Sequence, residues 1–153
     1  MKILVVYDTK HGNTRKIAEE IASAFGADHQ AHLKRVAEAE PQDVASADVL
    51  VLGCPTHAWS PTPATKDFLK RLKGTFNEGK HAAAFDTKLS SRFAGSAARK
   101  LEKSLSKLGF QIAAPRLSAI VSGMKGPLGE GQIEKAREFA AAILAGISDK
   151  PES

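Results

Sequence analysis

The sequence of 153 residues predicts a single α/β domain in which helices cover both faces of a parallel sheet. Apolar runs and amphipathic stretches alternate along almost the whole chain, a pattern typical of parallel strands joined by helical crossovers. Two of the expected strands, residues 2–7 and 48–53, are mostly apolar without alternation, as strands buried on both faces are. The composition, 42% hydrophobic and 25% charged, is that of a globular protein.

The first strand is expected at residues 2–7 and the first helix at residues 14–25. Ile17, Ile21 and Phe25 fall on one face of that helix, which is the pattern of a helix packed against a sheet. The glycine directly after Phe25 marks the end of the helix.

The chain continues with a weakly alternating stretch at 28–36, which predicts an edge strand, and a short helix at 41–47. The second buried strand follows at 48–53. A proline-rich loop then leads into a helix that is expected to end near Leu72, before Gly74.

Two more strands are expected in the second half, at residues 81–86 and at 110–122, the latter broken near Pro115. The helices around the last strand have apolar stripes: Ala97, Leu101, Leu105 and Leu108 before it, and Ile133, Ala136, Ala140, Ile143 and Leu144 after it. The expected domain therefore covers residues 1–147, with a polar tail at 148–153.

A single cysteine, Cys54, rules out an internal disulfide, which is typical of a reducing compartment. The apolar run after Met1 and Lys2 is too short for the core of a signal peptide, and no segment is long and apolar enough to span a bilayer. The sequence therefore predicts a cytoplasmic protein with no membrane span.

Three loops are expected at one edge of the sheet and together mark the candidate binding site. Residues 8–14, 54–63 and 86–94 each follow the carboxyl end of an expected strand. In open parallel sheets, ligands bind beyond these strand ends, where the strand order reverses.

The first of these loops has the features of a phosphate site that needs no metal. Between a buried strand and a helix it contains Thr9-Lys10-His11-Gly12-Asn13-Thr14. Backbone N–H groups and the positive end of a helix dipole converge in such a place, and Gly12 permits a positive φ. The alternative is that Thr9 and Asn13 only cap the helix. Neither the triphosphate loop nor the G-x-G-x-x-G dinucleotide loop is present.

This hexapeptide resembles the phosphate loop of the flavodoxin family. Further resemblance lies in Gly53-Cys54-Pro55-Thr56-His57-Ala58-Trp59, Phe85-Asp86-Thr87 and Lys107-Leu108-Gly109-Phe110, and it covers residues 1 to about 146. The resemblance implies a flavodoxin-like three-layer sandwich with a five-stranded parallel sheet in the order 2-1-3-4-5. It also implies an electron carrier with noncovalent FMN that cycles between oxidised, semiquinone and hydroquinone states.

On this resemblance, the first loop holds the FMN phosphate and two later segments hold the ring. The cofactor-binding residues that it implies are Thr9, Lys10, His11, Gly12, Asn13, Thr14, Pro55, Thr56, His57, Ala58, Trp59, Asp86, Thr87 and Lys88.

An aromatic side chain is expected to stack on the flavin ring. Trp59 is the only tryptophan and lies on a loop. His57, counted from Gly53, falls where several flavodoxins place their stacking residue, so either residue fits. Trp59 could instead fill a gap in the core, and His11 is expected either near the phosphate or in solvent.

Two departures from the family concern the ring. Ala58 follows His57 where many flavodoxins have a glycine whose carbonyl bonds the N5–H of the reduced flavin. Because alanine resists positive φ, weak stabilisation of the semiquinone is expected. The loop after Phe85 has no tyrosine, and Arg92 or Phe93 lies near the place of the second stacking aromatic, so one ring face is expected to be open.

A third departure is the charge, since electron-carrying flavodoxins are usually acidic and this chain has a formal net charge of +5. From Lys66 to Lys107 there are 11 basic and 4 acidic residues, expected beside the flavin edge. The excess predicts either a redox partner protein with an acidic docking surface or a small acidic substrate, with solvated helix faces as the alternative. Nothing in the sequence indicates nucleic-acid binding.

Electron transfer is the main functional prediction, and two alternatives stay open. One is an FMN-dependent oxidoreductase acting on a quinone or a porphyrinogen-like acid; the other is a non-redox binding or regulatory module. Cys54 lacks the arginine six residues later that low-molecular-weight phosphatases need, so it is expected to be a buried packing residue. A response regulator is excluded because Asp8 has no acidic neighbour and the third strand ends in Gly53.

Overall fold

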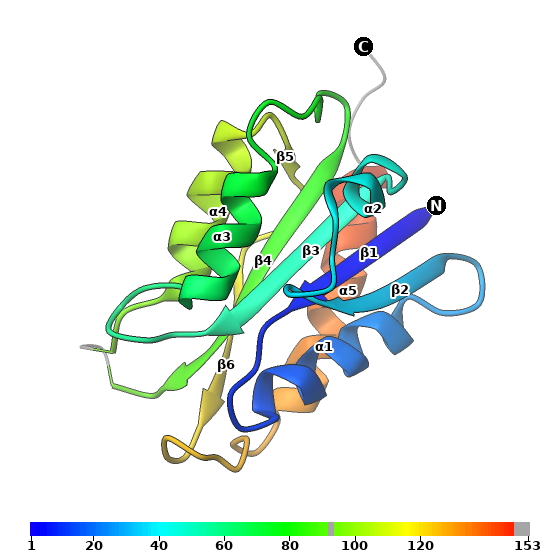
Figure 1. The fold of residues 1–153 in the computed structure, drawn as a ribbon. Coiled ribbons are helices and arrows are strands. Elements are labelled where there is room, and N and C mark those ends of the chain that lie inside the picture. The colour runs from blue at the N-terminus through cyan, green and yellow to red at the C-terminus, as the bar shows by residue number, and fades with distance from the viewer. Residues whose placement is uncertain (92–93, 149–153) are drawn as a thin grey trace.

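The computed structural model describes residues 1–91 and 94–148 and contains one parallel sheet. Its strands are β1 (Lys2–Tyr7), β2 (Gln30–Arg35), β3 (Val49–Pro55), β4 (His81–Leu89), β5 (Gln111–Ile112) and β6 (Leu117–Val121). The order is β2-β1-β3-β4-β5, and β6 also pairs with β4 (Figure 1). The predicted order 2-1-3-4-5 is therefore confirmed, with the fifth position occupied by two short segments on either side of Pro115.

Helices cover both faces of the sheet, as the sequence predicts. They are α1 (Asn13–Ala24), α2 (Pro41–Ala45), α3 (Pro63–Arg71), α4 (Ala97–Lys107) and α5 (Gln132–Ser148). Helices α1 and α5 pack on one face, while α2, α3 and α4 contribute to the core on the other (Figure 1).

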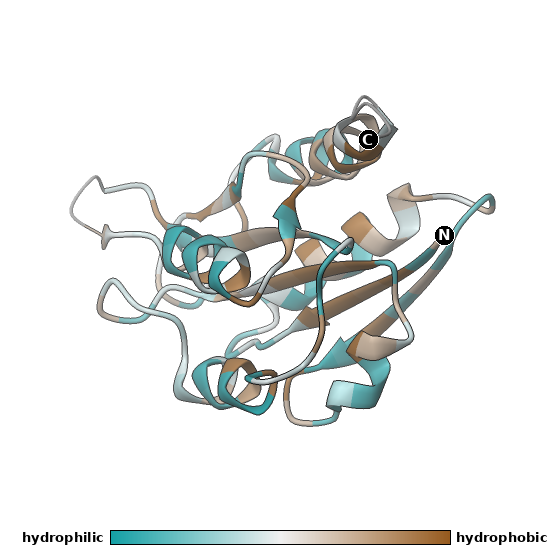
Figure 2. Ribbon diagram, turned by 90° about the horizontal axis from the view of Figure 1, so that it is seen from above, coloured by the Kyte–Doolittle hydropathy of each residue, from teal (hydrophilic) through white to brown (hydrophobic). Residues whose placement is uncertain are grey.

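Strand β1 shows how the two cores are divided. Ile3 and Val5 belong to the core under α1 and α5, whereas Leu4 and Val6 belong to the core under the other three helices. Successive side chains of a strand point to opposite faces, so a strand between two helical layers must be apolar at every position. Figure 2 shows the result as hydrophobic strands between helices that carry hydrophilic outer faces.

Strand β4 is longer than the sequence predicts, and this changes the place of two candidate site residues. The expected strand ends at residue 86, but pairing with β6 continues it to Leu89. Thr87 and Lys88 therefore lie on a strand rather than on a loop. A strand holds their side chains more rigidly than a loop does, because Thr87 is paired with both β3 and β6 and Lys88 is paired with β6.

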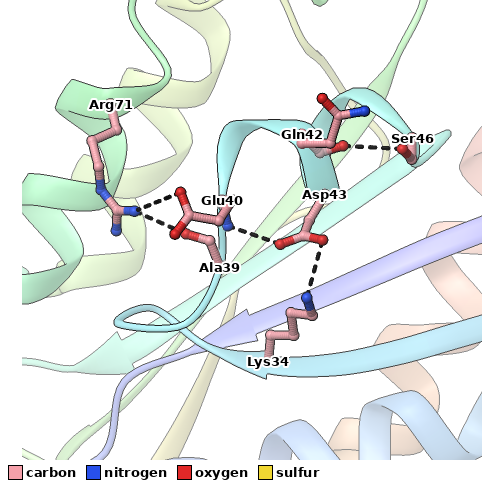
Figure 3. A network of polar contacts seen from close by, with 7 residues as sticks. All are labelled: Lys34, Ala39, Glu40, Gln42, Asp43, Ser46 and Arg71. Atoms are coloured by element: carbon pink, nitrogen blue, oxygen red, sulfur yellow. Dashed lines mark hydrogen bonds and ion pairs between the residues drawn. The ribbon is translucent and has the colours of Figure 1, made fainter.

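A polar network fixes the short helix α2 against its neighbours (Figure 3). The Asp43 carboxylate accepts a hydrogen bond from the Glu40 backbone N–H at 2.8 Å and pairs with the Lys34 ammonium at 3.0 Å. These two contacts, the backbone bond first, lower the pKa of Asp43. Arg71 of α3 donates to the carbonyls of Ala39 at 2.9 Å and Val36 at 3.0 Å, so α3 is tied to the segment that precedes α2.

Some expectations fall on residues outside the part of the chain that the structure describes. Arg92 and Phe93 are among these, and so is the polar tail beyond Ser148, which is itself the last residue of α5. Within the described residues, no helix combines the length and the apolar character that crossing a membrane requires.

Candidate functional site

Two adjoining hollows lie at the carboxyl edge of the sheet, with volumes of about 110 and 410 Å³. Six residues from the ends of β1, β3, β4 and β6 line both of them: Lys10, Thr56, His57, Lys88, Leu89 and Met124. The hollows therefore form one continuous site where the three predicted loops meet.

Most of the predicted site residues line these hollows. They are Thr9, Lys10, His11, Asn13, Thr14, Pro55, Thr56, His57, Ala58, Trp59, Thr87 and Lys88. The two exceptions are Gly12, which shapes the first loop, and Asp86, which is fully buried behind the site.

The first loop ends in an uncapped helix. Gly12 has φ +90°, and its N–H donates to the Thr9 hydroxyl at 3.0 Å. The first hydrogen bond of α1 runs from the Lys16 N–H to the Gly12 carbonyl, and no side chain caps the helix. The amide N–H groups of the first turn are thus available to an anion. The alternative that Thr9 and Asn13 cap α1 is wrong.

Asn13 instead fastens the first loop to a segment that the sequence analysis missed. Its side-chain amide donates to the Lys125 carbonyl at 3.2 Å in the loop between β6 and α5. A Cβ on Gly126, which has φ +99°, would lie 2.6 Å from the same amide. This loop therefore needs glycine to approach the first one, and it brings Met124 to the rim of the site.

Thr14 lies at the bottom of the site, with 1% of its surface exposed. Its hydroxyl is 2.8 Å from the hydroxyl of Thr87 on β4. A hydroxyl donates one hydrogen bond and accepts others, so Thr14 can accept from Thr87 while donating to an anion.

The second loop is a two-residue hairpin. His57 and Ser60 exchange backbone hydrogen bonds of 2.9 and 2.8 Å, and the residues between them, Ala58 and Trp59, have φ of +47° and +66°. The expectation that alanine avoids positive φ here is wrong. Twin positive φ values are the requirement of the tight hairpin turn, which matches the twist of paired strands.

Trp59 is 58% exposed and lines the larger hollow, so it does not fill a gap in the core. Its indole packs against Gly95, where an added Cβ would lie 2.2 Å from Cδ1 of the ring. His57 is exposed and lines both hollows. Both aromatic residues therefore border the space in which a flat ligand would lie.

Asp86 does not line the site but holds together two segments next to it. One carboxylate oxygen accepts hydrogen bonds from the Thr56 hydroxyl at 3.0 Å, the Ser96 hydroxyl at 2.8 Å and the Ala98 N–H at 3.0 Å. These donors lie after β3 and at the start of α4. Asp86 thus links the base of the hairpin loop to α4, and it has no place in the lining.

The lining of the two hollows is electropositive. Lys10 and Lys88 line both, and no aspartate or glutamate is among the described lining residues. Neither lysine forms an ion pair with a described carboxylate. An anionic ligand would therefore meet uncompensated positive charge.

Cys54 lies at the end of β3, fully buried. Burial raises the pKa of its thiol to about 11 despite hydrogen bonds from Thr62 and Thr65. A thiol protonated at neutral pH is a poor nucleophile. The structure thus places Cys54 as a packing residue, as predicted.

Four lining residues were missed by the sequence analysis: Leu89, Ala94, Val121 and Met124. Val121 and Met124 follow the carboxyl end of the last strand, in a glycine-rich loop. The rule that singled out the other three loops applies equally to this one. Leu89 and Ala94 lie within the candidate segment 86–94, but neither was singled out as a site residue.

Comparison with known proteins agrees with this geometry. Residues 5–145 match the family model for flavodoxin. The flavodoxin of Aquifex aeolicus (strain VF5) is 39% identical over 92 residues, covering 56% of this chain and 49% of that protein. A flavodoxin of Synechococcus elongatus is 40% identical over 55 residues, covering 36% of this chain and 32% of that protein. The chain thus spans half or less of the length of the curated relatives it matches.

Among solved structures, flavodoxin 2 of Bacillus cereus superposes with a TM-score of 0.84 at 25% identity, covering 95% of this chain and 99% of that one. Oxidised flavodoxin 1 of the same organism gives 0.83 at 20% identity, with coverages of 95% and 98%. Because the family model matches residues 5–145, nearly the whole chain, and the chain has the fold of these solved flavodoxins, this protein belongs to the flavodoxin family.

Proposed function

We propose that this chain holds FMN noncovalently in the two hollows and passes electrons between redox partners. The observation that carries the proposal is the uncapped N-terminus of α1, which faces a site lined by Thr9, Asn13 and Thr14. When bound, FMN supplies the redox chemistry. The chain's own residues bind the phosphate, orient the ring and set the charge around it.

The phosphate fits the first loop. A phosphomonoester offers acceptor oxygens to the amides of the first turn of α1 and to the hydroxyls of Thr9 and Thr14. Charge-assisted hydrogen bonds of this kind are about twice as strong as neutral ones. Lys10 adds positive charge at the exposed rim, and His11 lies beside it.

The ring fits the space between the hairpin and the segment after β4. Trp59 and His57 offer a flat surface from the hairpin, and Leu89, Ala94 and Met124 offer apolar contact in the same hollow. Stacking contributes about 0.5–1.5 kcal/mol beyond the burial of area.

The partner is a protein with an acidic docking surface, which the formal net charge of +5 and the concentration of lysines on α3 and α4 support. A cytoplasmic location accompanies this proposal, because the one cysteine is unpaired and buried.

Titration of the apoprotein with FMN, riboflavin and FAD tests the cofactor assignment. FMN is expected to bind far more tightly than riboflavin, which lacks the phosphate that engages the first loop, and a preference for FAD would contradict the assignment. Trp59 is the only tryptophan, so its fluorescence should be strongly quenched at saturation if the indole lies near the ring. The matched variant His57→Ala should leave that quenching in place. Equal affinity for FMN and riboflavin would contradict the phosphate assignment, and unchanged emission would leave His57 as the stacking residue.

Lys88 is expected to raise the potential of the second one-electron reduction step. That step adds negative charge to the ring, and a cation about 4 Å away stabilises it by on the order of 4 kcal/mol at an effective dielectric of 20, less when solvent screens it. Lys88→Gln should therefore lower that potential by tens of millivolts, measured in an anaerobic titration. Lys135→Gln on the exposed face of α5 is the control. Equal potentials in the two variants would contradict a role for Lys88.

The sequence-based expectation of a weakly stabilised semiquinone would also favour the second electron, but it depended on Ala58 resisting a positive φ. Ala58 has φ +47°, so this expectation no longer supports a raised potential. Arg92, a second cation close to Lys88 in the sequence, lies outside the described residues. The lining lysines alone support a raised potential.

A further inference from the structure

A separate hollow of about 290 Å³ lies between α3 and α4, with lysines around an apolar floor. Its lining, called here the lysine groove, consists of Lys66, Leu69, Lys70, Lys73, Ser104, Lys107 and Leu108. The two helices lie side by side on the same face of the sheet (Figure 1). The lysine groove shares no residue with the FMN site.

The spacing of these residues makes a continuous surface. Lys66, Leu69, Lys70 and Lys73 are at positions i, i+3, i+4 and i+7, so they follow one face of α3 into the turn after it. Ser104, Lys107 and Leu108 repeat the i, i+3, i+4 spacing at the end of α4. The seam between the helices therefore has apolar side chains in the middle and ammonium groups along its sides.

The positive charge of the lysine groove is not compensated within the described residues. None of its four lysines forms an ion pair with a described carboxylate. On α4, Glu102 pairs with Arg116 at 3.4 Å. Like charges one turn apart on a helix destabilise it by about 0.2–0.5 kcal/mol per pair. The free protein thus carries a repulsion that a partner's carboxylates would relieve.

The position of the lysine groove differs from the sequence-based expectation. The basic residues were expected beside the flavin edge, but Lys73 follows the C-terminal end of α3 and Lys107 is the last residue of α4. Those ends point away from the carboxyl edge of the sheet, where both helices begin near Asp8 and Asp86. A protein bound in the lysine groove would leave the mouth of the FMN site uncovered.

We propose that the lysine groove binds an acidic amphipathic helix of a partner protein. An apolar side chain of that helix packs on Leu69 and Leu108, and carboxylates on either side of it pair with the lysines. The apolar floor favours a helix over a nucleic acid, whose phosphates would use the cations only. This inference rests on the proposed function and adds to it a binding site for the partner. The partner would be held at the lysine groove, while electrons would pass through the separate, uncovered FMN site.

The test uses the full chain with FMN present and a fluorescent synthetic helix of about 18 residues, or five turns. The peptide carries leucine at i, i+3, i+4 and i+7 on one face and glutamate elsewhere. One control peptide has glutamine for each glutamate, and a second has the same composition in scrambled order. Anisotropy gives the affinity over a range of salt concentrations, and a single-stranded oligonucleotide serves as a competitor.

The acidic peptide is expected to bind at low salt, weaken steeply as salt rises, and exceed both control peptides by roughly tenfold or more. The double variant Lys70→Glu with Lys107→Glu should lose that affinity. The double variant Lys2→Glu with Lys135→Glu, which changes the net charge equally, should keep it within about twofold. All variants should bind FMN as the wild type does.

Three results would overturn the inference: equal losses in the two double variants, equal binding of the scrambled peptide, or displacement of the peptide by the oligonucleotide at lower concentration. Because FMN binding is measured in the same samples, failure of the lysine groove and failure of the cofactor assignment are distinguishable.

Discussion

Thr14→Val is expected to weaken FMN binding by roughly 10- to 100-fold, which corresponds to the loss of one hydrogen bond to a charged group. The hydroxyl of Thr14 lies at the bottom of the site, where it contacts Thr87 and has 1% of its surface exposed. Valine keeps the shape of the side chain and removes only the hydroxyl. A larger apolar residue at this buried position would overpack the site, so its effect would not be specific to the phosphate.

The comparison with riboflavin makes this result specific. Riboflavin lacks the phosphate, so its affinity should be nearly the same for the wild type and for Thr14→Val. Thr65→Val, another buried threonine that does not line the site, is the matched control and should retain FMN affinity. If Thr14→Val lowered the affinities for FMN and for riboflavin by the same factor, the Thr14 hydroxyl would not act through the phosphate.

Asp86→Ala is expected to lower the free energy of unfolding by about 2–4 kcal/mol. It leaves the hydroxyls of Thr56 and Ser96 and the N–H of Ala98 without their acceptor, and the carboxylate is fully buried. Urea unfolding of the protein without added FMN measures the change directly.

Asp86→Asn separates hydrogen bonding from charge. The amide oxygen can accept the same three hydrogen bonds, while the amide nitrogen takes the place of the oxygen that has no hydrogen-bond partner. The asparagine variant is therefore expected to lie within about 1 kcal/mol of the wild type. Equal destabilisation by alanine and asparagine would show that the charge, and not the set of three hydrogen bonds, stabilises this region.

Much of the fold can be predicted from the sequence, because apolar patterns and the proline and glycine residues that end helices and strands act on neighbouring residues. The apolar runs place β1 and β3, and Pro115 correctly marks the break between β5 and β6. The end of β4 could not be predicted, since it depends on pairing with residues 117–121, far along the chain.

The parts of the candidate site that follow the carboxyl ends of the parallel strands could be predicted from the sequence. Three loops were located by this rule, and the fourth, which carries Met124, follows from it as well. The role of Asp86 was not predictable, because whether a carboxylate at a strand end faces the site or the start of α4 depends on tertiary packing. Ala58 and Trp59 have positive φ values, although alanine and tryptophan normally avoid them. This could not be predicted locally, because the hairpin is held by tertiary contacts such as that of Trp59 with Gly95.

The hairpin at residues 57–60 has a kinetic consequence for the free protein. Each non-glycine residue in the left-handed region costs about 1–2 kcal/mol, and the two here are adjacent. About 1.4 kcal/mol changes a population ratio tenfold, so we expect the free protein to open this loop more often than a hairpin with an Asn-Gly turn would open. A ligand that covers the closed hairpin would then be expected to leave at a rate that depends on how often the hairpin reopens.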